Sequence, residues 1–240
     1  TGVELSPGTR QLKALTLATG ERIETDAAVF AVGHSSRDTF ALLHGQGVAM
    51  EPKPFSIGFR IEHPQPLIDQ ARWGEHAGHP ILGAADYKLV HHASNGRSVY
   101  SFCMCPGGLV GGATSEEGRV VTNGMSQYSR NERNANSGIV VAITPDDYPG
   151  GPLAGVDFQR ELESRAFVLG GSNYKAPAQR LADFLAAKPS SDLGSGRPSY
   201  APGVTPTDLS TALPEFAIEA IREALPAFAK QIPGFDHSDA

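Results

Sequence analysis

The segment Phe-Ser-Ile-Gly-Phe-Arg-Ile-Glu-His, residues 55–63, alternates between apolar residues and polar or small ones. A period of two places its apolar side chains on one face of a strand and Arg60 and Glu62 on the other, where the two charges can pair with each other. This pattern predicts a half-buried strand of an antiparallel sheet. Further strands are expected near residues 87–91, 98–105, 119–122 and 139–143, so a β-rich region begins near residue 51.

The residues before this region follow a different pattern. Residues 12–25 indicate a hairpin around Thr19-Gly20, and the short apolar run 27–32 predicts a strand buried on both faces, as in a parallel sheet. A helix over residues 39–45 should follow, with Ser35 as its N-cap, Asp38 as the capping-box partner and Gly45 or Gly47 as its end. A strand, a glycine turn and a helix N-terminus can bind an anionic ligand, although any such unit gives the same pattern.

Helices are expected again in the last third of the chain. Apolar spacing of three or four residues predicts a helix over 158–169, a second beginning at Pro177, and a third beginning at Pro214 that Pro226 must kink or restart. Residues 187–207 are rich in Pro, Gly and Ser, which is typical of a long loop or a crossing between domains.

Composition excludes several classes of protein. The chain of 240 residues has a formal net charge of -6, and its 20 Lys and Arg residues are scattered, which argues against nucleic-acid binding. The longest apolar run is too short to span a membrane, and two cysteines cannot build a secreted disulfide framework. We therefore expect a cytoplasmic protein without membrane partners. The first residue, Thr1, also permits the interpretation that the chain is a piece of something longer.

The hexapeptide Cys-Met-Cys-Pro-Gly-Gly, residues 103–108, is the most unusual motif. In a strand from Ser98, alternation puts Cys103 and Cys105 on one face and Tyr100, Phe102 and Met104 on the other, which should face the core. Three interpretations stay open: small apolar packing, pocket lining, and a redox pair or metal site. Zinc would need two further ligands, and no second cysteine pair supplies them.

A second polar run spans residues 123–137 and contains Asn123, Ser126, Arg130, Asn134 and Asn136. Asn, Gly and Ser are turn formers, so a solvated turn is one interpretation. The other is a recognition loop, because amides and guanidinium groups without carboxylate neighbours suit a carbonyl or carboxylate substrate.

Eight short motifs together resemble one known family, the bacterial FAD-dependent dehydrogenases of uncharacterised function. The matching stretches run in order along nearly the whole chain: residues 31–38, 53–55, 60–65, 103–108, 123–126, 134–137, 158–160 and 176–180. The resemblance implies an α+β fold, in which a β-rich substrate domain with helices is inserted into a glutathione-reductase-type, Rossmann-like FAD domain. It implies a partial α/β edge of the FAD domain over 1–50, the inserted substrate domain over 51–205, and a helical segment returning to the FAD domain over 206–240.

The resemblance also implies roles for individual residues. Gly33, His34 and Ser35 would lie near the cofactor, and Cys103, Cys105 and Arg130 would form the reactive face. The substrate would be bound by Gly107, Gly108, Asn123, Ser126, Asn134 and Asn136. The family's dinucleotide fingerprint is absent from residues 1–240, so we expect FAD in the intact enzyme and not in this chain alone.

The expected partners are a small-molecule substrate and flanking FAD-domain segments of the same protein, and the expected reaction is flavin-mediated hydride transfer. Two alternatives remain: a small-molecule binding module without catalysis, and a dithiol redox protein that uses Cys103 and Cys105.

Overall fold

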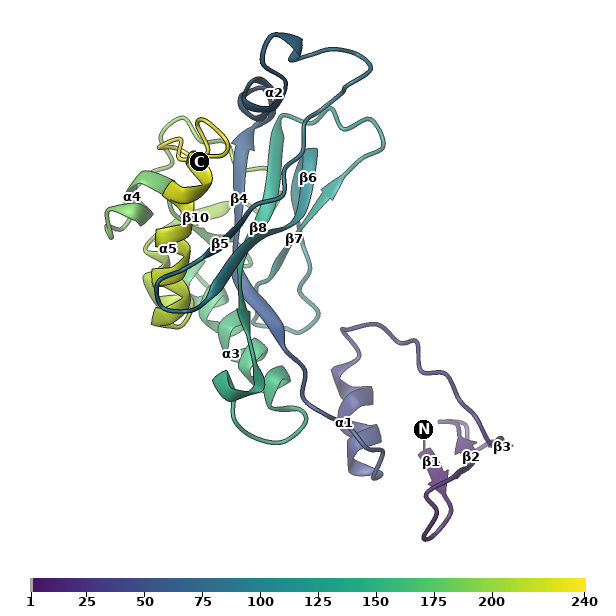
Figure 1. Cartoon of the computed structure of the whole chain (residues 1–240). Helices are drawn as coiled ribbons and strands as arrows, with labels where there is room; N and C mark the ends of the chain where they lie inside the picture. Colours follow the sequence, from purple (N-terminus) through teal and green to yellow (C-terminus); the bar gives the residue numbers. More distant parts are fainter. Residues whose placement is uncertain (1) are drawn as a thin grey trace. The chain divides into compact units, whose positions relative to one another are not determined.

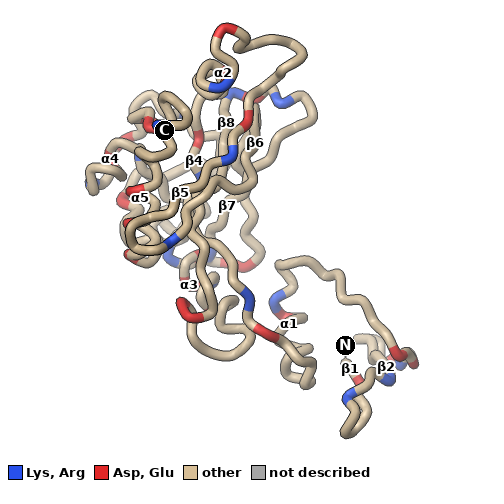
Figure 2. Tube along the Cα trace, in the orientation of Figure 1, with Lys and Arg blue, Asp and Glu red and all other residues tan. Residues whose placement is uncertain are grey.

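The computed structural model describes residues 2–240, which divide into two compact units. The first unit comprises residues 1–53 and 148–158, and the second comprises residues 54–147 and 159–240. The chain mixes helices and sheets, so the expected α+β class is confirmed (Figure 1). In the described chain no helix is long and apolar enough to cross a bilayer. Basic and acidic residues are interspersed along it (Figure 2).

The first unit contains a small antiparallel sheet and one helix. Its strands are β1 (Gly2–Leu5), β2 (Leu12–Thr16) and β3 (Arg22–Glu24), paired in that order. The hairpin predicted over residues 12–25 is confirmed by the β2–β3 pairing. Helix α1 (Arg37–Gly45) is tied to β1 because the Gln46 side chain accepts a hydrogen bond from the Val3 N–H at 2.7 Å.

Two expectations for the first unit were wrong. Residues 27–32 form no strand and are largely exposed, with Val29 93% accessible, because no described strand pairs with them. The N-cap of α1 is Ser36 rather than Ser35, and its hydroxyl donates to the Val32 carbonyl (2.8 Å) instead of capping the helix. The predicted end of the helix at Gly45 is confirmed, and Gly47 then turns the chain with φ +83°.

The second unit is built on a five-stranded antiparallel sheet of order β4-β8-β6-β5, with β7 paired to β6. The strands are β4 (Phe55–Pro64), β5 (Val90–His92), β6 (Ser98–Gly112), β7 (Thr122–Ser126) and β8 (Asn134–Ile143). The predicted strand over 55–63 is confirmed, and those over 98–105 and 139–143 are parts of longer strands. The strands expected over 87–91 and 119–122 lie a few residues further along the chain.

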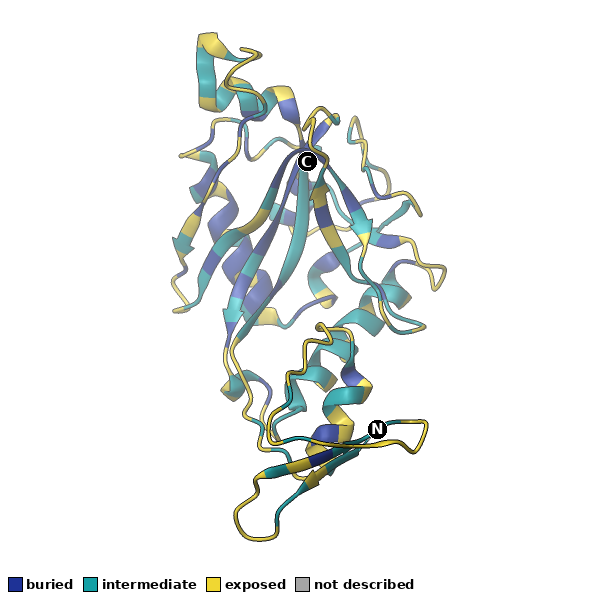
Figure 3. Ribbon diagram, turned by 90° about the vertical axis from the view of Figure 1, so that its right-hand side faces the viewer, coloured by how far each residue is buried: buried dark blue, intermediate teal, exposed yellow. Residues whose placement is uncertain are grey.

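Helix α5 (Glu215–Ala229) forms the main core of this unit. It packs on β4, β5, β6 and β8, and its apolar face is buried, including Ile218, Ile221 and Phe228 (Figure 3). The helix begins after Pro214 as predicted and continues past Pro226, which therefore does not restart it. Phe235 beyond the helix is also fully buried and contacts the ring of Phe228.

The remaining elements are short, apart from one helix. They are α2 (Gln65–Trp73), η1 (Gly74–His76), η2 (Pro145–Asp147), α3 (Ala154–Leu169), β9 (Ala176–Ala178), α4 (Leu181–Leu185), β10 (Val204–Pro206) and η3 (Leu209–Thr211). The helix predicted to begin at Pro177 begins at Leu181, because Pro177 lies in β9, which pairs in parallel with β10. The long loop 187–207 therefore contains a strand near its end.

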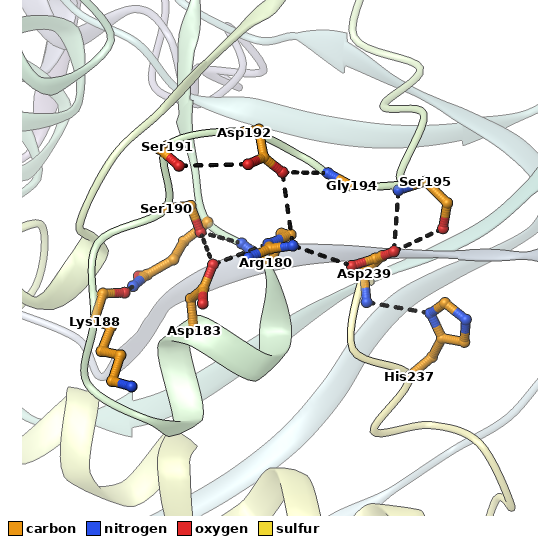
Figure 4. Close-up of polar contacts among 11 residues, drawn as sticks. Arg180, Asp183, Lys188, Ser190, Ser191, Asp192, Gly194, Ser195, His237 and Asp239 are labelled. Carbon is orange, nitrogen blue, oxygen red and sulfur yellow. Dashed lines mark hydrogen bonds and ion pairs between the residues drawn. The ribbon is translucent and has the colours of Figure 1, made fainter.

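A group of ion pairs around Arg180 connects the last described residues to the second unit (Figure 4). The Arg180 guanidinium lies 2.9 Å from Asp183, 3.6 Å from Asp192 and 3.7 Å from Asp239. The Asp239 carboxylate also accepts from the N–H and hydroxyl of Ser195. Together with the burial of α5, these contacts place residues 206–240 within the second unit.

Candidate functional site

The sheet of the second unit has one face under helices and one open face. The face of the sheet that carries Phe59 of β4 is the covered one. There the ring of Phe184 of α4 contacts the Phe59 ring, with 5.8 Å between the ring centroids. Its neighbouring side chains Ile57, Val141 and Val99 are buried. Because alternate residues point to opposite faces, Arg60 lies on the other face.

Strand pairing defines what lies beside Arg60. Arg60 is opposite Gly138 on β8, and Gly138 is opposite Phe102 on β6. Residues opposite one another in a sheet share a face, so Arg60 and Phe102 lie on the same open face with a glycine between them. Phe102 is 60% exposed there.

The expectation that Phe102 faces the core was therefore wrong. Val99, from the other set of alternating residues, is fully buried and pairs with Val141. The alternation also fails beyond Phe102, because the register shifts between Phe102 and Cys105 and Cys103 has φ +47°. Cys103 is exposed and Cys105 is buried, so the two thiols do not line one face together.

The Arg60 guanidinium is surrounded by neutral acceptors. Its Nη1 donates to Asn136 Oδ1 (2.6 Å) and to the Cys103 carbonyl (3.3 Å), and its Nη2 donates to Asn123 Oδ1 (3.4 Å). The expected pairing with Glu62 does not occur, because Glu62 accepts from Asn134 and Ser199 instead. The structure thus brings together Arg60, Asn123 and Asn136.

Asn136 is the most buried member of this group. It is fully buried, and its Nδ2 has no hydrogen-bond partner among the described residues. Gly124 makes the arrangement possible, because a Cβ at this position would overlap Arg60 Nη1 and Asn136 Oδ1. A buried amide donor without a partner is unusual in proteins, and a water molecule or a ligand beside Asn136 would satisfy it.

The turn 106–108 is held by the protein's own groups. Gln65 Oε1 accepts from the Gly107 N–H at 2.6 Å, and the Ser126 hydroxyl donates to the Pro106 carbonyl at 2.8 Å. A Cβ on Gly107 would overlap the Arg130 carbonyl, and one on Gly108 would overlap the Met125 carbonyl. The backbone of residues 125–131 therefore occupies the space that the missing side chains of these glycines leave.

Arg130, which we expected at the reactive face, contributes its backbone to this turn. It has φ +48°, and its side chain is exposed. Asn134 lies in the neighbouring polar group, where its Nδ2 donates to Glu62 and to the Arg197 carbonyl, both at 3.0 Å. Gln65 lies in the matching stretch 60–65, but the sequence did not predict its role, which depends on the fold bringing the start of α2 to the turn.

The Cys105 thiol shows no sign of activation. Burial, followed by the neighbouring Cys103, raises the pKa of the Cys105 thiol. The Cys105 thiol donates to the Cys103 carbonyl at 3.3 Å. A raised pKa disfavours the thiolate that dithiol chemistry requires. In residues 2–240 no three His, Cys, Asp or Glu side chains are grouped to bind a metal ion.

The first unit has a groove of about 380 Å³ beside the predicted cofactor turn. It is lined by Val3, Phe30, Val32, Asp38, Thr39, Leu42, Leu43 and Gln46. Gly33, His34 and Ser35 are exposed and do not line it. Gly33 has φ +76° and open space where a side chain would be.

Comparison with known proteins identifies the family of the second unit. Residues 54–240 match the family described as "FAD-dependent protein, C-terminal domain-like". The chain belongs to this FAD-dependent protein family. An uncharacterised protein of Clostridium beijerinckii is 49% identical over 223 residues, which cover 92% of this chain and 42% of that relative.

The family match supports FAD in the intact protein. The turn at Gly33 has open space around it, and residues 29–32 of the first unit are exposed. On the sheet, the donor groups of Arg60 and Asn123 suit electron-rich oxygen or nitrogen atoms.

Proposed function

We propose that this chain is the middle, substrate-binding portion of a longer FAD-dependent oxidoreductase, a dehydrogenase. The family match over residues 54–240 supports the flavoprotein class. The 42% coverage of the Clostridium relative leaves room for the dinucleotide fingerprint elsewhere in such a protein. We further propose that the first unit is the edge of a Rossmann-like FAD domain whose remaining segments bind most of the cofactor.

The observation that carries this proposal is the Arg60 cluster on the open face of the family domain. A partly exposed cation whose hydrogen-bond acceptors within residues 2–240 are two neutral amides and a carbonyl is positioned to attract an anionic or carbonyl group. When bound, FAD supplies the electron-pair chemistry of a hydride transfer. Arg60 and Asn123 orient the substrate, and the exposed Phe102 ring contacts its apolar part.

Other residues act on the shape of this site. Gln65 and Ser126 hold the turn 106–108, and Asn136 holds the Arg60 side chain in place. Arg130 and Asn134 remain proposed substrate-orienting groups at the rim of the site. In this scheme the exposed Cys103 lies at the reactive face, the buried Cys105 packs behind it, and the raised pKa of Cys105 argues against covalent chemistry at that thiol.

The proposal is tested in the full-length protein under anaerobic conditions. Candidate organic acids are added, and flavin reduction is followed by the loss of its visible absorption. We expect at least one substrate to reduce the flavin and Arg60→Gln to slow that reduction with FAD content unchanged. A full-length protein that lacks flavin and still binds a small molecule would instead support the non-enzymatic binding module.

A further inference from the structure

We propose that the open sheet face at Arg60, Asn123 and Phe102 binds a small organic acid, with its carboxylate on Arg60 and an apolar body on Phe102. Calling this acid the substrate rests on the proposed function above, whereas its binding does not. Arg60 carries the charge at this face, available donors and the buried Asn136 lie beside it, and Phe102 adds an apolar surface.

The charge of Arg60 has no counter-ion within the described chain. Its three hydrogen-bond acceptors are two amide oxygens and one backbone carbonyl. The nearest acidic residue on its own strand face, Glu62, is occupied by the Ser199 hydroxyl (2.6 Å), the Ser199 N–H (3.0 Å) and Asn134 (3.0 Å). A guanidinium that is partly desolvated and unpaired gains most from an anionic ligand.

Donor groups point to a carboxylate in particular. Arg60 Nη1 is already used twice, while Nη2 makes one long bond of 3.4 Å to the exposed Asn123. Nη2 and the Asn123 amide group therefore offer N–H donors next to each other, and a carboxylate has two oxygens to accept from them. No carboxylate of the chain competes for these donors among the contacts described above.

The buried side of the cluster fixes the guanidinium for this task. Asn136 Oδ1 holds Arg60 Nη1 at 2.6 Å, and Asn136 Nδ2, fully buried, lacks a partner among the described residues. An unsatisfied buried donor adds to the positive character of the site. Gly124 keeps the space that Arg60 and Asn136 need.

Phe102 provides the apolar surface for the body of the ligand. Arg60, Gly138 and Phe102 form one row across three strands, and Gly138 has no side chain to separate the other two. Strands lie about 4.8 Å apart, so the ends of this row are about 10 Å apart at the backbone. An exposed ring at this distance from a cation favours an aromatic or aliphatic acid over inorganic phosphate.

The test uses benzoate as the probe and the 240-residue chain, followed by NMR of the arginine Nε–H groups and by calorimetry. Benzamide controls for the charge, acetate for the apolar body, and phosphate for a bare anion. Arg60→Gln removes the charge, Arg60→Lys keeps it, and Gly124→Ala displaces the cluster without changing charge. Arg72→Gln is the matched control, because Arg72 is exposed and its Nε donates to the Asp86 carbonyl.

We expect saturable benzoate binding that shifts the Arg60 resonance and weakens by about tenfold or more in Arg60→Gln and Gly124→Ala, with Arg60→Lys between them. Arg72→Gln should change the affinity by less than about twofold. Benzamide, acetate and phosphate should each bind more weakly than benzoate.

Three results would overturn the inference: equal binding of benzoate and benzamide, equal loss in Arg72→Gln, or no saturable binding by a chain whose circular dichroism shows it folded. If the variants fail to fold, wild-type resonance shifts still decide, because benzoate must then shift Arg60 and leave Arg72 unchanged. Benzoate binding at Arg60 in a protein that never takes up FAD would support this inference and refute the proposed function.

Discussion

Replacing Phe235 with alanine should strongly destabilise the second unit. The Phe235 ring is fully buried and contacts three other rings, at centroid distances of 4.7 Å to His63, 5.5 Å to Tyr87 and 5.7 Å to Phe228. Truncating a buried Phe to Ala removes its transfer free energy and leaves a cavity, which together cost about 3–5 kcal/mol. At roughly 2–4 °C per kcal/mol for a chain of this size, we expect the Tm to fall by about 10 °C.

The assay is urea unfolding followed by the fluorescence of Trp73, the single tryptophan, which lies on α2 in the second unit. Phe235→Leu should recover more than half of the loss, because it refills most of the cavity. Tyr128→Ala is the control, since Tyr128 is fully exposed and should change the free energy of unfolding by less than about 0.5 kcal/mol. A Phe235→Ala variant as stable as the control would refute the assignment of residues 230–240 to this core.

Three further perturbations follow from the structure. Burial lowers the pKa of His63 to about 4, so its neutral form stabilises the fold above pH 6.5. This contribution is lost as the pH falls, by about 2 kcal/mol of unfolding free energy at pH 5. Urea titrations at several pH values should show this loss in the wild type and not in His63→Gln. Arg97 lowers the pKa of Asp147 through two hydrogen bonds of 2.7 and 2.5 Å. Asp147→Asn should therefore lower the free energy of unfolding by about 1–3 kcal/mol at pH 7, and by less below pH 4. An unchanged free energy of unfolding at pH 7 would show that this ion pair does not stabilise the fold. Purified residues 1–240 should contain no FAD by absorption spectroscopy, and a yellow chromophore near one per chain would contradict this.

Local alternation predicted much of the sheet. Residues 55–63 supply a complete period of two, and the structure keeps it from Ile57 on the covered face to Arg60 on the open one. The same reasoning failed in β6, because alternation identifies two faces without saying which one the helices cover. There Val99 is buried and Phe102 is exposed, the reverse of our expectation.

Predictions that depended on pairing with a distant strand also failed. Residues 27–32 have the composition of a buried strand, but a strand needs a partner for its N–H and C=O groups, and none of the described strands pairs with it. The turn after Cys103 depends on a register shift with β8, which short motifs do not encode.

The candidate site was only partly predictable. Asn123 and Asn136 were expected to bind a substrate, and the structure brings them to one guanidinium. That guanidinium is Arg60, which the sequence placed in a pair with Glu62, because strand alternation cannot show that Ser199, far along the chain, occupies the carboxylate first. The resemblance to FAD-dependent proteins supplied the family, which the match over residues 54–240 then showed.

The most direct test is the FAD content of the full-length protein, measured as flavin released on denaturation per polypeptide. We expect about one FAD per full-length chain, retained in Arg60→Gln and absent from residues 1–240. A folded full-length protein that contains no flavin and takes none up when FAD is added would contradict it.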